Sequence, residues 1–469
     1  MFIGRARELN FLEEKYSGSN GSLILVYGRR RIGKTALVNQ FDRGKKTIYL
    51  LATQEEKILV IRNFSKIVAQ FFEDALTLNN PFSDWDSFFS YLSEKIEASD
   101  GRIVIVMDEI TYLIEQDRSF LSILQKFYDT RLKNTNSMLI LTGSLINVVY
   151  TDILNYDSPL YGRRTGNIEL LEMKFSEIKE FFPNLSMEEL VYVYSIFGGV
   201  PFYLELIGNG ERPIEKFLNK NNIFYNDVQF ILNQEMRSPE KYFSILKLVS
   251  DGKTTAGEIS GAMNLNSNEL SPYLNKLLSM KILNKEFPVF SKKKRGEIYN
   301  LTSNYFNFYF RYIFERQELL ETGRENILLK YIESDISAYI SGIFENICRD
   351  FLISKSEKIF GVEFLEMGRW WGRNSKKSRG KDIEEIDIVA RYENNGILFG
   401  EVKWQNIKIG KDAYMDLKRK SEMFQCADKM FVLISRSGFD DELLSYADGS
   451  DDKLFLIDLE FMKKSLFPE

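Results

Sequence analysis

The stretch Leu23–Phe41, LILVYGRRRIGKTALVNQF, decides the fold of the first part of the chain. An aliphatic run ends at a glycine, three arginines follow, and Gly-Lys-Thr then precedes an amphipathic segment. The run predicts a buried strand and the amphipathic segment predicts a helix, so the loop between them leads from a strand into a helix N-terminus. Residues 28–35 of this loop fit the pattern G-x-x-x-x-G-K-[ST] at every fixed position.

This pattern predicts a loop whose main chain wraps a phosphate. The glycines let the backbone come close to the anion, and the following helix presents its N-terminus to the same group. Lys34 is expected to reach the β- and γ-phosphates of a bound ATP or GTP, and the Thr35 hydroxyl to bind Mg²⁺. The predicted nucleotide contacts in the loop are Gly28, Arg31, Ile32, Gly33, Lys34, Thr35 and Ala36.

Strand-like and helix-like pieces alternate up to about residue 170, which favours a parallel α/β sheet. The strand-like runs are SLILVYG, KKTIYLLA, RIVIVMDEI and SMLILTGS. The third run ends in an acidic pair, where Asp108 is expected to hold Mg²⁺ and Glu109 to polarise the attacking water. At the end of the fourth run, either Thr142 or Ser144 is placed to sense the γ-phosphate. A carboxylate base beside a bound nucleotide indicates hydrolysis; the alternative is an acidic pair in an exposed turn.

The composition excludes several kinds of chemistry. The chain of 469 residues contains no histidine, which rules out imidazole bases, Ser-His triads and histidine-ligated zinc. The two cysteines, Cys348 and Cys426, cannot form a disulfide framework. Together with the absence of a signal peptide and of an apolar run of about 18 residues, this predicts a cytoplasmic protein without a membrane partner. The net charge of −5 means that any DNA or RNA surface must be a local patch.

Changes in pattern along the chain predict an α/β multidomain protein. A parallel-sheet ATPase core, residues 1–170, is followed by a helical lid, 171–235. Three short helices and a basic-tipped hairpin at 236–315 are typical of a winged helix. A helical linker, 316–334, then leads to a second α/β unit, residues 335–469.

The motifs of the first half resemble those of the prokaryotic, mainly archaeal, ATPases of the AAA+/STAND group. The similar segments are FIGRARELNFL, the phosphate loop, MDEI, LTGS, PLYGRRTG and GGVPFYLEL. The resemblance implies ATP as the nucleotide. It also implies that the N-terminal segment lies against the adenine, through Gly4-Arg5 and Glu8-Leu9.

Two further elements of the first half are assigned by the same resemblance. The Gly-Gly-x-Pro turn that contains Pro201 is similar to the lid element that reads the nucleotide state. Arg163 and Arg164 resemble the arginine that stabilises the charge on the transferred phosphate, acting within the chain or from a neighbouring subunit of a homo-oligomer. Ordinary surface charge is the alternative for these two arginines.

The segment EEIDIVARYENNGILFGEVKW predicts a second chemical site. Asn394-Asn395-Gly396 is a turn signal between two strand-like runs, so the segment is expected to form a β-hairpin. Because strands alternate with a period of two, Asp387, Glu401 and Lys403 can meet at one end of the hairpin. Two carboxylates suit Mg²⁺ or Mn²⁺, and a lysine can orient water for attack on a phosphodiester.

The C-terminal segments GIFENICRDFL, GRWWGR and EIDIVA…GEVKW resemble the PD-(D/E)xK restriction-endonuclease-like domain. The resemblance implies a restriction-endonuclease-like α/β fold and adds Glu345, on the helix before the hairpin, to the metal ligands Asp387 and Glu401. Two alternatives stay open: a conserved fold with an inactive site, or plain surface charges on a strand pair.

Two basic segments are candidates for contact with nucleic acid, probably DNA. The first, MGRWWGRNSKKSRGK, carries six cations (Arg369, Arg373, Lys376, Lys377, Arg379 and Lys381) beside Trp370 and Trp371. The second, Ser291–Glu297, lies where a winged helix has its wing. A solvated loop and a protein-binding winged helix are the respective alternatives. The interpretation is an ATPase that couples its nucleotide state to DNA binding and cleavage, with an ATP-driven regulatory switch as the competing hypothesis.

Overall fold

The computed structural model describes residues 2–209, 212–236, 238–291, 296–374 and 383–467. The chain forms two compact units, which are described separately. The N-terminal unit comprises residues 1–173, 200–203 and 231–237, and the C-terminal unit comprises 174–199, 204–230 and 238–469. The finer domain boundaries expected from the sequence remain predictions.

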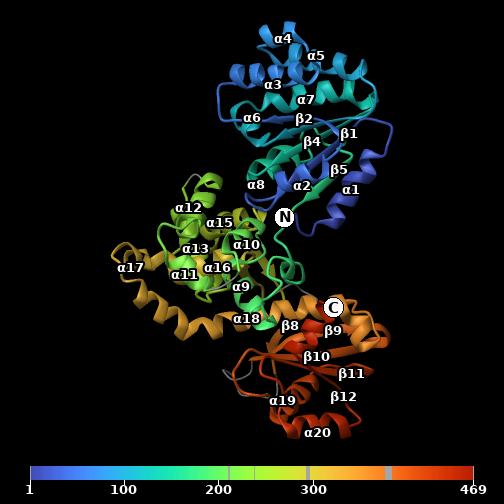
Figure 1. Ribbon diagram of the computed structural model, residues 1–469. Coiled ribbons are helices and arrows are strands. Elements are labelled where there is room, and N and C mark those ends of the chain that lie inside the picture. The colour runs from blue at the N-terminus through green and yellow to red at the C-terminus, as the bar shows by residue number, and fades with distance from the viewer. Residues whose placement is uncertain (1, 210–211, 237, 292–295, 375–382, 468–469) are drawn as a thin grey trace. The chain divides into compact units, whose positions relative to one another are not determined.

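A five-stranded parallel sheet in the order β2-β3-β4-β1-β5 forms the centre of the N-terminal unit (Figure 1). Its strands are β1 Ser22–Tyr27, β2 Lys46–Leu51, β3 Ile103–Asp108, β4 Ser137–Gly143 and β5 Gly166–Glu169. The parallel α/β sheet expected from the sequence is confirmed, with every residue of β1, β3 and β4 buried. The fifth strand was not predicted, because GNIE is short and polar and is ordered by pairing with β1.

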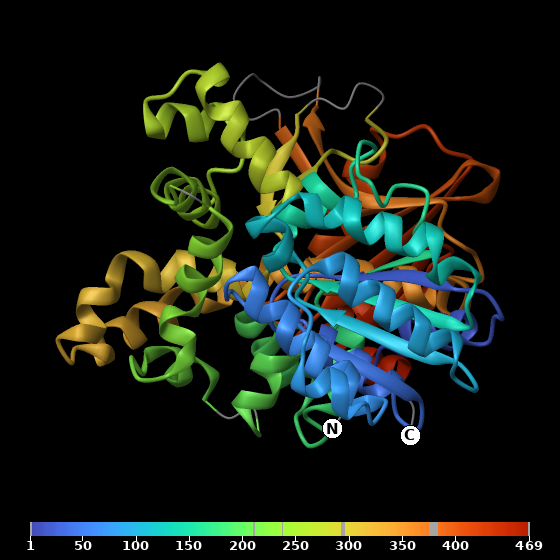
Figure 2. The ribbon, with the colours of Figure 1, turned by 90° about the horizontal axis from the view of Figure 1, so that it is seen from above.

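Helices cover both faces of this sheet, blue to teal in Figures 1 and 2. One layer is held together by aromatic contacts among α3, α5 and α7, such as the stacked rings of Phe89 and Phe127 with centroids 4.3 Å apart. The helices of the unit are α1 Ala6–Tyr16, α2 Lys34–Phe41, α3 Lys57–Phe71, α4 Ala75–Asn79, α5 Trp85–Glu97, α6 Thr111–Gln116, α7 Ser119–Thr130, η1 Leu132–Asn134, α8 Ile146–Val148 and η2 Val149–Ile153.

Helices also fill the segment predicted as a lid: η3 Phe175–Glu180, α9 Met187–Phe197, α10 Pro201–Ile207, α11 Pro213–Leu218 and α12 Ile223–Glu235. The three helices expected next are α13 Glu240–Ser250, α14 Ala256–Met263 and α15 Ser267–Ser279. Thr255 and Asn266 cap α14 and α15 through capping boxes, as their sequences indicate. The antiparallel strands β6 Leu283–Glu286 and β7 Ile298–Leu301 follow, and the assignment of this segment as a winged helix stays a prediction.

A 36-residue helix, α18 Glu325–Phe360, runs without a break through the position predicted as a domain boundary at 334/335. It is preceded by α16 Asn304–Phe308, η4 Tyr309–Ile313, η5 Phe314–Arg316 and α17 Gln317–Glu321. Among the helices that the structure describes, none combines the length and the apolar character that crossing a bilayer requires.

The chain ends in a mixed five-stranded sheet, β12-β11-β10-β9-β8, with α18 on one face and α19 and α20 on the other (Figure 1). Strands β8 to β10 are antiparallel, whereas β10 to β12 are parallel. The hairpin predicted around Asn394 and Asn395 is present, and both asparagines adopt positive φ angles of 58°. The elements are β8 Glu366–Arg373, β9 Ile383–Tyr392, η6 Glu393–Asn395, β10 Gly396–Lys403, α19 Lys411–Ser421, β11 Asp428–Ser435, α20 Asp441–Gly449, β12 Lys453–Asp458 and α21 Leu459–Leu466.

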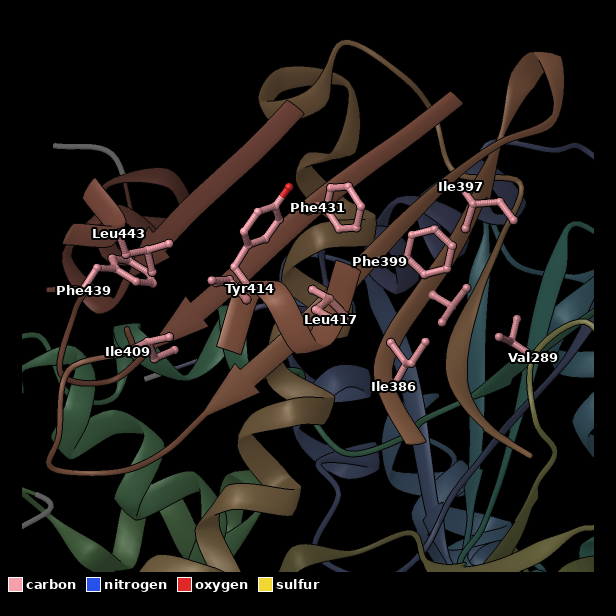
Figure 3. Packing of buried hydrophobic residues seen from close by; sticks show 12 residues of the cluster. Val289, Ile386, Ile397, Phe399, Ile409, Tyr414, Leu417, Phe431, Phe439 and Leu443 are labelled. Carbon is pink, nitrogen blue, oxygen red and sulfur yellow. The ribbon is translucent and has the colours of Figure 1, made fainter. Parts of the chain in front are cut away.

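The segment after β6 is built into this second sheet. The Val289 N–H donates to the Arg369 carbonyl of β8 over 2.9 Å. The Val289 side chain joins the hydrophobic core that contains Phe399 and Tyr414 (Figure 3), and Phe290 packs against the same core. The wing expected to contact DNA phosphates is therefore anchored, at its start, to the edge strand of the C-terminal sheet.

A buried arginine fixes the start of β1. The Arg102 guanidinium donates to the carbonyls of Lys15, Gly18 and Asn20 and to the Ser22 hydroxyl. These bonds tie the turn after α1 to the beginning of β3, and burial lowers the pKa of Arg102 from its usual value.

We expect Arg102→Leu to lower the free energy of unfolding by about 3 kcal/mol, because three carbonyls and the buried Ser22 hydroxyl lose their donor. Chemical denaturation followed by circular dichroism measures the effect. The exposed Arg131 of the same unit offers a matched control, since Arg131→Leu should change the stability by less than about 0.5 kcal/mol. Equal destabilisation by both substitutions would contradict this role.

Candidate functional site

The loop after β1 has the backbone that phosphate binding requires. Gly28 and Gly33 have φ angles of 158° and 94°, and Arg31 between them lies in the left-handed region at 68°. A Cβ atom on Gly28 would lie only 2.4 Å from the Leu170 carbonyl oxygen, so a side chain is excluded there. The loop therefore depends on glycine at this position for its path.

Lys34 follows this loop and is almost completely buried, with 5 % of its surface exposed. Its ammonium donates to the carbonyls of Gly28, at 2.9 Å, and Arg29, at 3.2 Å. Burial lowers the pKa of Lys34, while the carboxylates of Glu109 and Asp108 act to raise it. The ammonium thus lies against the loop carbonyls, and the acidic groups are close enough to affect its pKa.

Asp108 ends β3 and collects hydroxyl groups from three neighbouring elements. Thr35 Oγ1 donates to its Oδ2 over 3.2 Å, and the hydroxyls of Tyr49 and Thr142 donate to the same carboxylate. Burial and the Asp108 carboxylate together raise the Tyr49 pKa far above its usual value. A carboxylate beside a threonine hydroxyl is an all-oxygen donor set of the kind that Mg²⁺ prefers, so Thr35 and Asp108 fit this ion.

Glu109 is held at the end of β4. Its backbone is left-handed, with φ 57°, and its Oε2 accepts hydrogen bonds from the Ser144 amide at 3.1 Å and the Ser144 hydroxyl at 2.6 Å. The hydroxyl of Thr142, the other residue predicted to sense the γ-phosphate, donates to Asp108. The strand order explains the arrangement: β4 lies between β1 and β3, so its end lies between the phosphate loop and the acidic pair.

The N-terminal segment and the Gly-Gly-x-Pro turn both lie against the phosphate loop. Arg5 Nη2 donates to the carbonyls of Leu171, at 2.5 Å, and Ile32, at 3.4 Å. Pro201 lies 3.9 Å from the position of a Cβ on Gly33. Gly4, Arg5 and Pro201 are therefore next to the expected nucleotide position, and their contacts with ATP stay predictions.

The three consecutive arginines of the loop each contact a different neighbour, and the predicted contact of Arg31 with the nucleotide stays a prediction. Arg29 pairs with Glu172 at 3.2 Å, and Arg30 donates to the Tyr112 hydroxyl. Arg31 lies over the Phe202 ring, 4.7 Å from its centroid. They fasten the loop to the sheet edge, to α6 and to the segment after Pro201.

Arg163 and Arg164 are not bound to the phosphate loop in the described part of the unit. They precede β5, next to the start of β1, where the Thr165 N–H donates to the Leu23 carbonyl over 2.8 Å. Arg163 pairs with Asp129 at 3.1 Å, and Arg164 donates to Asn167 at 3.1 Å. A role as a finger inside the same chain is therefore not observed, and a role in a neighbouring subunit stays a prediction.

Sequence reasoning missed two residues of this site, Tyr49 and Glu235. Glu235 lies at the end of α12, and its carboxylate accepts the N–H groups of Ile146 and Asn147 at 3.0 and 3.3 Å, directly after Ser144. It also contributes to the electric field at Lys34. No motif marks either residue, because each reaches the site through strand order or long-range folding.

The C-terminal hairpin brings its predicted residues together. The register of the hairpin ends at the pair Ile388 and Gly400. Asp387 is next to Ile388 on β9 and therefore lies opposite Glu401 of β10. Its Oδ2 accepts the Val402 N–H over 2.9 Å, while the Lys403 ammonium donates to Glu401. Lys420 of α19 lies 3.8 Å from the other Glu401 oxygen.

Glu345, on α18, belongs to the same electrostatic cluster. Burial, with Asp387 and Glu401 nearby, raises the pKa of Glu345 to about 7. Burial and the Glu401 charge likewise raise the pKa of Asp387. Among the described residues, no group of three or more acidic or cysteine side chains is arranged to hold a metal ion. The ligand set of Glu345, Asp387 and Glu401 therefore stays a prediction.

The basic segments give a mixed result. Residues 292–295 and 375–382, which include Lys376, Lys377, Arg379 and Lys381, lie outside the described residues. Trp370 is half-buried and packs edge-to-face against Phe424, with centroids 5.0 Å apart, at the margin of the hydrophobic core. Trp371 donates its indole N–H to the Gly296 carbonyl over 3.2 Å and links β8 to the wing.

Comparisons with known proteins agree with this architecture. Residues 2–207 match an ATPase domain described as predominantly from Archaea, and residues 309–415 match a domain described as archaeal and bacterial proteins of unknown function. An uncharacterized protein of Methanocaldococcus jannaschii is 34 % identical over 450 residues, which cover 93 % of this chain and 96 % of that protein.

The fold is also similar to solved structures. A Walker-type ATPase of Pyrococcus abyssi matches with a TM-score of 0.51 and 19 % identity, over 66 % of this chain and 96 % of that one. The ORC2 protein of Aeropyrum pernix, solved with ADPNP and ADP, aligns at a TM-score of 0.42 and 13 % identity over 71 % of this chain and 96 % of that one. The restriction-endonuclease-like fold stays a prediction for the C-terminal sheet. The chain belongs to the predominantly archaeal family of P-loop ATPases in which this ATPase domain precedes the C-terminal domain of unknown function.

Proposed function

We propose that the N-terminal unit hydrolyses ATP with Glu109 as the base that orients the attacking water. The observation that carries the proposal is the double hydrogen bond from Ser144 to Glu109, next to Asp108 and the phosphate loop. A carboxylate fixed in this way has one oxygen engaged by the protein and the other available to a water molecule.

Binding rests on the loop. Its main-chain N–H groups and the N-terminus of α2 attract the phosphates, and Lys34 can exchange its bonds to loop carbonyls for bonds to phosphate oxygens. Thr35 and Asp108 would hold Mg²⁺, which would neutralise charge on the phosphates. Gly4, Arg5 and Pro201 would contact the nucleotide at the edges of the loop.

Two substitutions separate binding from turnover. Lys34→Ala removes the ammonium and should abolish ATP binding measured by calorimetry, whereas the exposed Lys133→Ala should bind normally.

Glu109→Gln should bind ATP with unchanged affinity and lose at least about a hundredfold in kcat, because the general base is gone. Phosphate release measures turnover, and full hydrolysis by Glu109→Gln would assign the base to another residue.

Ser144→Ala tests whether Ser144 positions the base. The variant loses one hydrogen bond to a charged group, so we expect kcat to fall about tenfold while the Kd for ATP stays unchanged. Ser144→Thr keeps the hydroxyl and should restore most of the rate. A weaker Kd with an unchanged kcat would mean that Ser144 acts on the phosphate rather than on Glu109.

For the C-terminal unit we propose metal-dependent cleavage of a phosphodiester in nucleic acid, with DNA as the favoured substrate. The observation in favour is that Asp387 lies opposite Glu401 and accepts the Val402 N–H, while Lys403 pairs with Glu401. Burial and the Glu401 charge raise the pKa of Asp387, which a divalent cation would relieve, and Mg²⁺ is commonly held by one or two carboxylates together with substrate phosphate. Lys403 would orient the attacking water.

Incubation of DNA with Mg²⁺ or Mn²⁺ tests this second activity. We expect cleavage by the wild type, at least about a hundredfold less by Asp387→Asn and Lys403→Ala, and full activity in Glu393→Gln, an exposed carboxylate at the turn of the same hairpin. Identical products from all variants would remove the nuclease hypothesis. The C-terminal unit would then be a binding or regulatory module that is switched by ATP turnover.

A further inference from the structure

Two adjoining cavities lie between the β6–β7 hairpin, α18 and β8 of the C-terminal unit. Their volumes are about 430 and 690 Å³. They share part of their walls, so they form one double cavity, defined here by the shared residues Glu286, Asn300, Leu301, Asn304, Ile343, Asn346 and Arg349. Each is large enough to hold a small ligand.

The smaller cavity is lined by several arginine side chains, and it lies next to the β9–β10 hairpin. Glu345 and Arg349, one helical turn apart on α18, both line it. Arg349 Nη1 donates to the Asp387 carbonyl over 3.1 Å, which connects the cavity wall to strand β9. Arg369 of β8 also lines the cavity, and its buried Nε has no hydrogen-bond partner among the described residues.

The larger cavity adds aromatic and aliphatic walls. Phe175 and Tyr194, whose ring centroids lie 5.5 Å apart, face it together with Phe287 and Ile347. A ligand that fills both cavities therefore needs an anionic group for the arginines and a flat, largely apolar group for the rings. A nucleotide has both.

We propose that the double cavity binds one nucleotide of a single-stranded nucleic acid, with its phosphate against Arg349 and Arg369 and its base against the aromatic side chains. The inference rests on the proposed phosphodiester cleavage, because the bound phosphate would lie next to Glu345 and the hairpin. The face of a paired base is stacked within the duplex and cannot lie against the aromatic side chains, so the strand must be single or locally opened. The asparagines of the shared wall provide hydrogen bonds to the base or the sugar.

The ligand would also join two parts of the unit. Glu286 and Asn300 belong to the β6–β7 hairpin, Arg349 belongs to α18, and Arg369 belongs to the edge strand of the sheet. Arg349 Nη2 and Glu286 Oε1 are 4.0 Å apart across the cavity wall. A bound phosphate would compete with Glu286 for this guanidinium.

Fluorescence anisotropy of labelled dT20, U20 and a 20-base-pair duplex, measured in EDTA, tests binding without cleavage. We expect at least one of the two single strands, dT20 or U20, to bind more tightly than the duplex. Arg369→Ala should weaken single-strand binding at least about tenfold and reduce the slope of log K against log salt by about 0.7, the value for one lost phosphate contact. Arg349→Lys, which keeps the charge but not the fork geometry, and Tyr194→Leu should each weaken it about threefold or more.

The matched control is Arg324→Ala, which removes a half-exposed arginine at the start of α18, outside the cavity. Binding by this variant should stay within about twofold of the wild type. Equal losses in Arg324→Ala and Arg369→Ala, or no loss in either, would overturn the inference. If the wild type binds single strands through Arg369 but cleaves none, the binding site stands and the nuclease proposal fails. If the protein cleaves and Arg369→Ala leaves the cleavage unchanged, the nuclease proposal stands and the binding site fails.

Discussion

The buried ammonium of Lys34 is the constraint on which the N-terminal unit depends. A charge removed from water is tolerated only where other groups replace its hydration. Here two loop carbonyls accept its hydrogen bonds, and Glu109 and Asp108 stabilise its charge from the end of β3. The loop geometry, the strand order and the acidic pair are therefore parts of one electrostatic arrangement, which a triphosphate can enter by replacing the carbonyls.

The same arrangement continues into segments that belong to both units. Ser144, which holds Glu109, is followed by two N–H groups that bind the Glu235 carboxylate. Glu235 ends α12, and residues of that helix up to Phe230 belong to the C-terminal unit. Helix α10 crosses between the units in the same way after Tyr203. Helices α10 and α12 are therefore covalently continuous between segments of the two units.

Local patterns in the sequence predicted much of this structure. The four apolar runs, the phosphate loop, the capped helices and the hairpin at Asn394 are each determined by neighbouring residues, so their spacing was enough. The short strand β5, the contact of Tyr49 with Asp108 and the position of Glu235 depend on which strands lie side by side. That order is set by packing of distant segments, and no short motif encodes it.

The wing shows a different limit of sequence reasoning. Its basic residues suggested contact with phosphates, but the apolar residues just before them, Val289 and Phe290, were the stronger signal for packing. Burying such side chains contributes about 1.5–3 kcal/mol each, whereas an exposed lysine contributes little to folding. The hydrophobic contact therefore decided where the start of the wing lies.

The two acidic sites use similar residues under different electrostatic conditions. Asp108 receives hydrogen bonds from neutral hydroxyls, so its negative charge remains available to a cation. At the hairpin, by contrast, the lysines 403 and 420 already balance Glu401. The arginines 349 and 369 lie near Glu345, whose carboxyl has a raised pKa. A phosphate alone would meet repulsion from the carboxylates, and a cation alone would meet repulsion from the lysines and arginines. The proposed cation and the proposed nucleotide would each remove the other's repulsion, so binding of the two at this site should be cooperative.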